Sequence, residues 1–191
     1  MKKIGISGVA RSGKDTFAKA AERFLTENGL KVKRYALARN LKGDRYHFVN
    51  ENFGFDIYHP TEEQKKLIRP LMVAYGCAQR EATKGKYWFS LIDAEFLFDE
   101  PDIAIVTDIR FCEYEYDECH WIKEDGGKLI HITLISDGRQ ILPANVEEAV
   151  NNPRLISRAD YNLRWESMSD DDAYQFVKKF FEDNPALWKD S

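Results

Sequence analysis

The chain has 191 residues, of which 43% are hydrophobic and 31% charged, as is typical of one soluble globular domain with a substantial core. Its formal net charge of -4 excludes the strongly basic field that holds a nucleic-acid backbone, so we expect no polynucleotide partner, while small anionic ligands stay open. No apolar stretch approaches the roughly 20 residues of a membrane span, and three cysteines without paired metal-ligand spacing predict free thiols. We therefore expect one cytoplasmic domain over residues 1–191, with no membrane partner.

The first third of the chain predicts a strand, a helix and a second strand. Residues 2–8 (KKIGISG) form a short β-type run that ends in glycine. From Lys14 the apolar residues follow the i, i+3, i+4, i+7 spacing of a core-facing helix, and Gly29 provides its C-terminal cap. Residues 32–38 (VKRYALA) predict the second strand, whereas the polar and aromatic stretch from about 40 to 60 predicts a loop with at most one short helix.

Helices and two buried strands are expected in the middle of the chain. Thr61 is a capping residue for the helical sequence that follows it, and Pro70 must kink that helix or begin a second one. Residues 87–98 (YWFSLIDAEFLF) predict another, buried helix. The near-continuous apolar run of residues 102–108 (DIAIVTD) is typical of a strand buried on both faces of a parallel sheet, and residues 128–135 (KLIHITLI) resemble it.

Three further segments complete the predicted order. Residues 112–125 predict a helix that Gly126 and Gly127 end, and the sequence SMSDDD (167–172) predicts the capped start of a C-terminal helix. The Arg-bearing stretch 136–158 fits neither a sheet nor a buried helix, so we expect a mobile flap there. The alternation of strands and helices predicts an α/β fold, with a central parallel sheet that helices cover on both faces.

The sequence GVARSGKDT (8–16) carries the main functional signal. Gly8, four residues and then Gly13 and Lys14 form a phosphate-binding P-loop motif, which lies between an apolar strand and an amphipathic helix as a P-loop requires. The glycines turn backbone N–H groups toward a phosphate, the helix N-terminus adds its positive dipole end, and Lys14 reaches the β- and γ-phosphates. The alternative is a strand–turn–helix connection that binds no ligand.

Asp15 departs from the motif, which usually has Ser or Thr at this position. A carboxylate there can hold magnesium, directly or through the water ligands of the ion, while Thr16 supplies a hydroxyl toward the α-phosphate. The alternative for Asp15 is an acid that only stabilises the start of the helix through the helix dipole.

Asp108 and Arg110 end the strand predicted at 102–108, which places both near the carboxyl edge of the sheet, where open α/β folds bind ligands. An acid there can hold the water ligands of magnesium, and an arginine can neutralise a phosphoryl group during transfer. The two residues are therefore candidate catalytic residues. The alternative is a structural ion pair.

Three cations and a tryptophan in the helical sequence are weaker candidates for an acceptor site. A phosphate is bound well by a guanidinium, and a base stacks on an aromatic face. The alternative is that the charges are solvated on helix surfaces and the tryptophan belongs to the core. These residues are Arg69, Arg80, Lys84 and Trp88.

Four pieces of the sequence resemble the phage-type deoxynucleoside monophosphate kinases, in the order found in that family and over most of the chain. They are GVARSGKDT, RPLMVAYG (69–76), YWFSLI (87–92) and IVTDIRF (105–111), and the GKD variant with a later D-x-R is the most specific. The resemblance implies a P-loop kinase fold that transfers the γ-phosphate of ATP to a deoxynucleoside monophosphate, with magnesium, in the cytoplasm of an infected cell. It also implies a homodimer.

The resemblance further implies roles for single residues. Those on the ATP phosphates are Arg11, Ser12, Gly13, Lys14, Asp15 and Thr16. Those near the acceptor, within a region over residues 39–90, are Lys42, Arg69, Trp88, Asp108 and Arg110. Two departures concern the acceptor. The sequence CEYE stands where the family often has Pro-Asn-Glu, so that Glu113 or Glu115 replaces its glutamate, and AYGC stands where Leu-Gly-Thr is common.

Phosphoryl transfer requires mainly positioning and charge neutralisation, so we expect Lys14, magnesium and Arg110 to stabilise the transferring group. No protein general base is needed, because an acceptor phosphate oxygen is already ionised at neutral pH. Arginines of the flap either close over ATP or stay solvated: Arg139, Arg154 and Arg158. Two other functions stay open, namely a kinase for another phosphorylated metabolite such as phosphomevalonate, and a nucleotide-binding or switch protein that is not an enzyme.

Overall fold

The computed structural model describes residues 1–189, and its centre is a six-stranded sheet. Within it, the strands β2-β3-β1-β4-β6 run parallel in that order, while β5 returns antiparallel beside the end of β4. The strands are β1 (Lys2–Ser7), β2 (Val32–Ala36), β3 (Ile103–Ile109), β4 (Lys128–Ser136), β5 (Arg139–Gln140) and β6 (Tyr161–Glu166).

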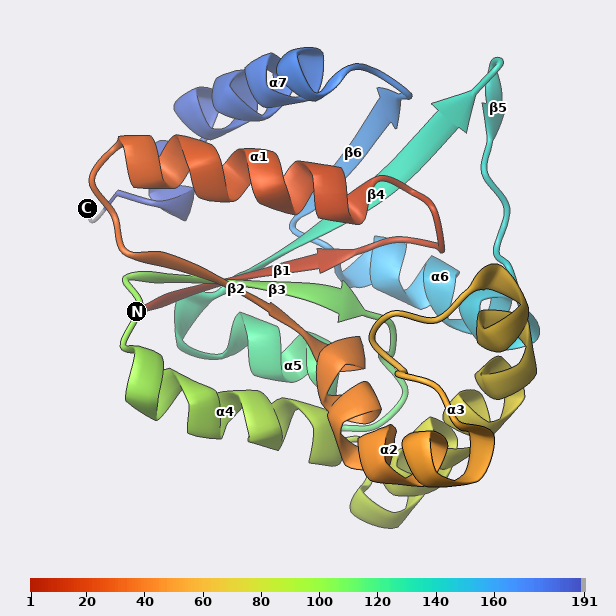
Figure 1. The fold of residues 1–191 in the computed structure, drawn as a ribbon. Coiled ribbons are helices and arrows are strands. Elements are labelled where there is room, and N and C mark those ends of the chain that lie inside the picture. The colour runs from red at the N-terminus through yellow and green to blue at the C-terminus, as the bar shows by residue number, and fades with distance from the viewer. Residues whose placement is uncertain (190–191) are drawn as a thin grey trace.

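Helices cover both faces of this sheet. They are α1 (Lys14–Glu27), α2 (Leu37–Phe53), α3 (Glu62–Thr83), α4 (Tyr87–Asp99), α5 (Glu118–Lys123), α6 (Val146–Arg158) and α7 (Asp170–Asp183), with short 3₁₀ turns at Glu124–Gly126 and Pro185–Leu187. Figure 1 shows α1 and α7 on one face, α4 and α5 on the other, and α2, α3 and α6 toward the end to which the parallel strands point. The predicted α/β fold with a parallel sheet covered on both faces is confirmed.

Each face of the sheet packs into its own hydrophobic core, and the side chains of β3 show this. Ile103 and Ile105 pack with α1 and α7, whereas Ala104 and Val106 pack with α4 and α5. Successive side chains of a strand point to opposite faces, so a strand buried on both sides needs an unbroken apolar run. Full burial of an isoleucine side chain contributes about 1.5–3 kcal/mol. Central strands such as β3 are therefore both the most stable and the easiest to predict.

The segment predicted as a loop between about 40 and 60 contains the 17-residue helix α2 instead. Only Leu37 and Val49 of this helix are buried, so its apolar positions form no helical stripe that the sequence could reveal. Val49 packs in a small third core with Ile68 and Met72 of α3. Tertiary packing against α3 and α4, rather than its own pattern, stabilises α2.

The regions around α3 and α5 agree in part with the predictions. Thr61 forms a full capping box with Gln64, and one helix runs across Pro70, so the prediction of a second helix there is wrong. The helix predicted over residues 112–125 is shorter, because α5 starts only after Asp117, whose side chain caps it. The polar stretch before Asp117 is a loop that approaches α3, where Glu113 accepts a hydrogen bond from Arg80.

The segment predicted as a flap, 136–158, forms the β5 hairpin and the helix α6. The side chain of Asn145 caps α6 by accepting a hydrogen bond from the backbone of Glu148. The strand β6 was not predicted at all. Its residues are largely exposed or half-buried at the sheet edge, so it lacks the apolar run that identifies a central strand.

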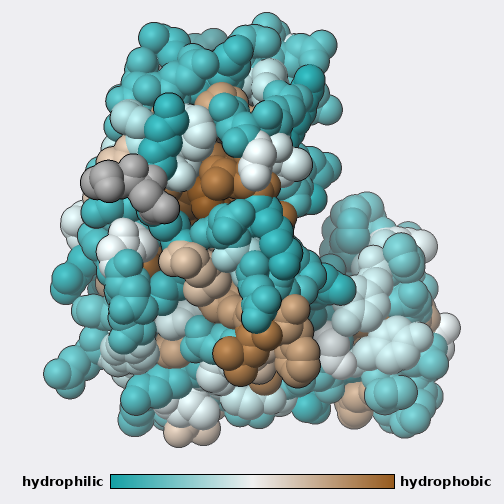
Figure 2. All heavy atoms as spheres, turned by 90° about the vertical axis from the view of Figure 1, so that its left-hand side faces the viewer, coloured by the Kyte–Doolittle hydropathy of each residue, from teal (hydrophilic) through white to brown (hydrophobic). Residues whose placement is uncertain are grey.

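Figure 2 shows the side of the molecule where the parallel strands begin and where Figure 1 places both chain ends. This face is mainly hydrophilic, with small apolar patches among the polar side chains. Leu97 and Phe98 at the end of α4 are mostly exposed. Within residues 1–189, no helix has the length and apolar character needed to cross a bilayer. The candidate site lies at the opposite end of the strands.

Candidate active site

The P-loop (residues 8–14) turns sharply after β1. Gly8, Arg11 and Gly13 all have positive φ angles, of 144°, 65° and 86°. A Cβ atom at Gly8 would lie 2.4 Å from the carbonyl oxygen of Ile132, and one at Gly13 would lie 2.4 Å from the ring of Trp165. Glycine is therefore required at both positions by backbone conformation and by close packing on β4 and β6.

Trp165 of β6 supports the P-loop from below. Its indole Nε1 donates a hydrogen bond to the carbonyl oxygen of Ser12 at 2.9 Å, and its ring packs edge-on against Phe17 of α1. Ser12 is fully buried, and its Oγ has no hydrogen-bond partner within residues 1–189. An unpaired buried hydroxyl is costly. A phosphate oxygen at the loop would give the Ser12 hydroxyl an acceptor.

Lys14 is the first residue of α1 and lies almost completely buried. Its Nζ donates a hydrogen bond to the carbonyl oxygen of Val9 at 2.8 Å. Burial lowers the pKa of Lys14, while the carboxylate of Asp108 opposes that effect. No side chain caps the N-terminus of α1, unlike α3, α6 and α7. The helix dipole, the open N–H groups and a buried ammonium together suit a phosphate.

The other predicted P-loop residues lie around this position. Arg11 and Asp15 are exposed, Asp15 in the first turn of α1, and Thr16 is half-buried. The described chain contains no group of three His, Cys, Asp or Glu residues that could hold a metal ion on its own. Magnesium is usually bound by one or two carboxylates together with substrate phosphates, and the single carboxylate of Asp15 fits that arrangement.

Asp108 and Arg110 lie at the carboxyl edge, as predicted. Asp108 has a positive φ of 64°, which bends the chain as β3 ends. Arg110 Nη2 donates to Asp108 Oδ1 at 3.2 Å, and Arg110 Nη1 donates to Glu148 Oε1 at 3.2 Å. Glu148 Oε2 accepts a hydrogen bond from the P-loop N–H of Ala10 at 3.3 Å. Through Glu148, the end of β3 and the P-loop share one polar centre.

A cavity of about 250 Å³ opens beside this centre. Five of the candidate residues from the sequence line it: Arg69, Arg80, Trp88, Asp108 and Arg110. An apolar wall completes it, formed by Leu37, Leu41, Met72, Val73 and Phe111. Lys42 lies on α2 next to Leu41 but is not among the lining residues, and neither is Glu113. The structure thus brings most of the predicted acceptor residues together at the end of β3.

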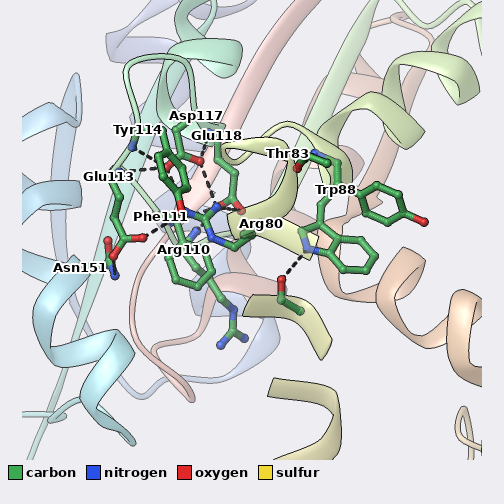
Figure 3. Close-up of polar contacts among 12 residues, drawn as sticks. Arg80, Thr83, Trp88, Arg110, Phe111, Glu113, Tyr114, Asp117, Glu118 and Asn151 are labelled. Carbon is green, nitrogen blue, oxygen red and sulfur yellow. Dashed lines mark hydrogen bonds and ion pairs between the residues drawn. The ribbon is translucent and has the colours of Figure 1, made fainter. Parts of the chain in front are cut away.

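Arg80, which also lines the cavity, belongs to a buried ion cluster that Figure 3 shows. Its two terminal nitrogens donate to the carboxylate of Asp117 at 3.0 and 3.1 Å, and Nη1 also reaches Glu118 at 3.2 Å. Glu113 pairs with it at 3.3 Å, and its guanidinium lies 3.6 Å from the ring centre of Phe111. Three carboxylates already bind Arg80, so its role here is structural and the alternative of a free helix charge is wrong.

Glu118 links that cluster to Arg110. Its Oε2 accepts hydrogen bonds from the backbone N–H groups of Arg110 at 2.8 Å and Phe111 at 3.2 Å. Burial raises the pKa of Glu118 to about 7, against the lowering effect of Arg80. In Figure 3 the side chain of Arg110 points away from the Arg80 cluster. Glu118 therefore fixes the turn from which Arg110 extends toward the P-loop.

His131 lies behind the P-loop on β4. Its Nδ1 is 3.0 Å from the hydroxyl of Ser7, and both residues are buried. Burial, together with the nearby charge of Lys14, lowers the pKa of His131 to about 4, so the ring is neutral at neutral pH. The sequence alone does not reveal that His131 packs behind the P-loop and hydrogen-bonds to Ser7, because it is a single histidine within an apolar strand.

The arginines predicted in the flap do not contact the P-loop. Arg139 is exposed on β5, Arg154 lies 3.8 Å from Glu113, and the backbone oxygen of Arg158 accepts a hydrogen bond from Lys123. The residue of this segment that does reach the P-loop is the acid Glu148, which the sequence analysis missed. It lies 38 residues from Arg110 in the chain, so no local pattern could identify it.

No protein-family model and no curated protein matches the chain. Solved structures with a similar fold include shikimate kinase from Bacteroides thetaiotaomicron, with 14% identity and a TM-score of 0.43, covering 95% of this chain and 98% of that one. Dephospho-CoA kinase from Campylobacter jejuni has 18% identity and a TM-score of 0.44, covering 96% and 97%. A sugar kinase from Janibacter sp. HTCC2649 has 12% identity and a TM-score of 0.37, covering 100% and 99%.

Proposed function

We propose that the protein is an ATP-dependent kinase and that its acceptor is a deoxynucleoside monophosphate. One observation carries the proposal. Arg110 lines the cavity and, through the carboxylate of Glu148, shares a polar centre with the backbone of Ala10 in the P-loop. A donor phosphate on the P-loop and an acceptor in the cavity would therefore meet at Arg110.

The donor side is built for a phosphate chain. Backbone N–H groups at the uncapped start of α1 and the ammonium of Lys14 lie at the P-loop. The buried hydroxyl of Ser12, which has no hydrogen-bond partner within residues 1–189, could donate to a phosphate oxygen there. Asp15, directly or through water, is the residue that would hold magnesium beside these phosphates. When bound, magnesium supplies neutralisation of charge on the phosphate oxygens.

The acceptor side combines cations with a rigid aromatic wall. Trp88 is held in place by Tyr75 and Tyr87, which pack edge-on at ring-centre distances of 5.9 and 4.7 Å, and its Nε1 donates to the carbonyl oxygen of Gly76 at 3.4 Å. A flat apolar wall suits a base, and Arg69 at the same cavity suits the phosphate of a monophosphate. Roles for Lys42 and Glu113 at the acceptor rest on the sequence resemblance alone.

The proposed chemistry relies on positioning. Arg110 holds its guanidinium where the γ-phosphate would pass from donor to acceptor, and a planar fork neutralises charge on two oxygens at once. Glu118 keeps the backbone of Arg110 fixed, so little reorganisation is needed during transfer. Asp108 orients the same guanidinium through its hydrogen bond at 3.2 Å. The acceptor phosphate oxygen is already an anion, so no residue has to remove a proton.

A coupled assay of ADP formation tests the proposal. ATP and magnesium are combined with each of the four deoxynucleoside monophosphates and, separately, with phosphomevalonate. We expect ADP to form only when a deoxynucleoside monophosphate is present, and we expect folded Lys14→Ala to lose nearly all of it. ADP formation with phosphomevalonate alone would assign the other metabolite class. ATP binding without ADP formation for any acceptor would leave a nucleotide-binding protein that is not an enzyme.

A further inference from the structure

The carboxylate of Glu148 occupies the polar centre between the P-loop and the end of β3. Its side chain is only 9% exposed, and Oε1 accepts a hydrogen bond from Arg110 at 3.2 Å. Oε2 accepts hydrogen bonds from the backbone N–H of Ala10 at 3.3 Å and of Ala144 at 2.9 Å. Its negative charge also acts on the ammonium of Lys14, whose pKa it raises against the larger lowering effect of burial. One anion is thus bound by a guanidinium and two backbone N–H groups.

These donors are of the kind that proteins use for phosphate oxygens. The guanidinium belongs to the residue to which the proposed function assigns the transferring group, and one of the N–H groups belongs to the P-loop. We propose that the carboxylate of Glu148 holds the place of a ligand phosphate at this centre, and that a phosphate must displace it to bind. The inference rests on the proposed function only for the identity of that phosphate. The site itself takes a phosphate oxyanion.

Displacement of Glu148 requires little loss of buried apolar surface. The segment that carries it, residues 141–150, contains no fully buried residue. Its side chains at Leu142, Val146 and Val150 are 76%, 75% and 48% exposed. The buried residues of α6 lie further along the helix and anchor its second half: Asn151, Asn152 and Leu155. Figure 1 shows an extended connection from β5 leading into the start of α6.

Competition of this kind lowers the apparent affinity for phosphate. Suppose that a ligand binds only to molecules in which Glu148 has left the site. Its apparent affinity is then the intrinsic affinity multiplied by the fraction of molecules in that state. If the carboxylate is in place in about nine molecules of ten, its removal strengthens phosphate binding by about tenfold. Neutralising Glu148 also removes a negative charge close to where the phosphate charge would lie.

Titration calorimetry with two phosphate probes tests the inference. Inorganic tripolyphosphate represents the donor chain and inorganic phosphate represents the acceptor group, so the two probes distinguish which phosphate competes with Glu148. The test variant is Glu148→Gln, which loses the negative charge and whose amide NH2 group cannot accept from Arg110, while an amide oxygen in the place of Oε2 still accepts from Ala10 and Ala144. The matched control is Glu147→Gln, because Glu147 is a neighbouring acid that lines the same cavity. We expect about tenfold tighter binding of one or both probes to Glu148→Gln, and a clearly smaller gain in the control, which reports the loss of negative charge alone.

Unchanged or weaker binding of both probes to folded Glu148→Gln would overturn the inference, as would an equal gain in Glu147→Gln. Should Glu148→Gln fail to fold, Glu148→Asp decides by the same criterion, because its shorter side chain cannot bridge Ala10 and Arg110 together. The probes carry no nucleoside, so their binding does not depend on which acceptor is phosphorylated. A gain in phosphate affinity without any turnover would uphold this inference and contradict the proposed function.

Discussion

Two acids far from each other in the chain hold Arg110 in place: Glu148 accepts a hydrogen bond from its guanidinium, and Glu118 accepts one from its backbone N–H. The spacing of Gly8, Gly13 and Lys14 identified the P-loop, and the short D-x-R sequence placed Asp108 and Arg110 at one edge of the sheet. Each of these signals lies within a few neighbouring residues. Glu148 reaches the P-loop only through tertiary packing of α6. Glu118 likewise acts on Arg110 through the fold, and neither acid forms a recognisable pattern.

Asp15 has two open roles that one substitution separates. It is exposed in the first turn of α1, where an acid stabilises the helix by about 0.3–1 kcal/mol and where it can also hold magnesium. We expect Asp15→Ser to retain turnover but to require a different magnesium concentration for half-maximal rate. The measurement is turnover against magnesium at fixed ATP. Coinciding titration curves for wild type and Asp15→Ser would reduce Asp15 to a helix-start acid.

Among the secondary structure elements, those that can be predicted carry their own periodicity. The helix α1 has a clear apolar stripe, β3 has an unbroken apolar run and α7 has a capping sequence, so all three were predicted close to their observed bounds. The helix α2 and the strand β6 have neither, since they are stabilised by neighbours rather than by pattern. The absence of a sequence signal for these two elements matters for function, because β6 supports the P-loop and α2 forms part of the cavity wall.

The support that β6 gives to the P-loop predicts a specific effect of Trp165→Phe. The change keeps an aromatic ring beside Phe17 but removes the hydrogen bond to Ser12. We expect unfolding free energy to fall by about 1 kcal/mol and ADP binding to weaken severalfold. The matched control is Trp121→Phe, which removes the hydrogen bond from the indole of a buried tryptophan of the other core to Asp93. A similar stability loss with no change in ADP affinity is expected for the control.

Equal ADP affinities for the two tryptophan variants would show that the hydrogen bond to Ser12 does not shape the P-loop. Binding is measured by calorimetry and stability by urea unfolding, so that the two effects are read separately. A weakened affinity in Trp165→Phe alone would assign β6 a positioning role.

For the molecule as a whole, His131 links stability to pH. Its pKa is about 4 in the folded state and about 6.5 in an unfolded chain, so between these values the unfolded state binds more protons. The stability that neutral His131 contributes is fully present above pH 6.5 and is lost as the pH falls toward 4. The slope reaches at most about 1.4 kcal/mol per pH unit.

Urea unfolding at pH 7 and at pH 5 measures this effect. We expect His131→Asn, whose side-chain amide can hydrogen-bond to Ser7 in place of Nδ1, to lose less stability than wild type between the two pH values. The exposed His47 provides the control substitution, His47→Asn, and that variant should behave as wild type. Equal losses of stability between pH 7 and pH 5 in wild type and His131→Asn would mean that a group other than His131 causes the loss of stability at low pH.

The whole architecture was more predictable than its peripheral segments. Alternating strand and helix signals were sufficient for the parallel sheet and its two helical layers, because that arrangement buries both faces of every central strand. The cavity was less predictable, since it forms where α2, α3 and α6 meet the end of β3. The homodimer and the deoxynucleoside monophosphate acceptor stay predictions from the resemblance.

Transfer of label from ATP radiolabelled at the γ-phosphate tests the central claim most directly. Wild type and Arg110→Ala are each incubated with magnesium and the four deoxynucleoside monophosphates, and the labelled products are separated. We expect labelled deoxynucleoside diphosphate from wild type, and a rate lower by about 10²-fold for Arg110→Ala without weaker ATP binding. Label that appears only as inorganic phosphate, or transfer at an equal rate by both proteins, would contradict it.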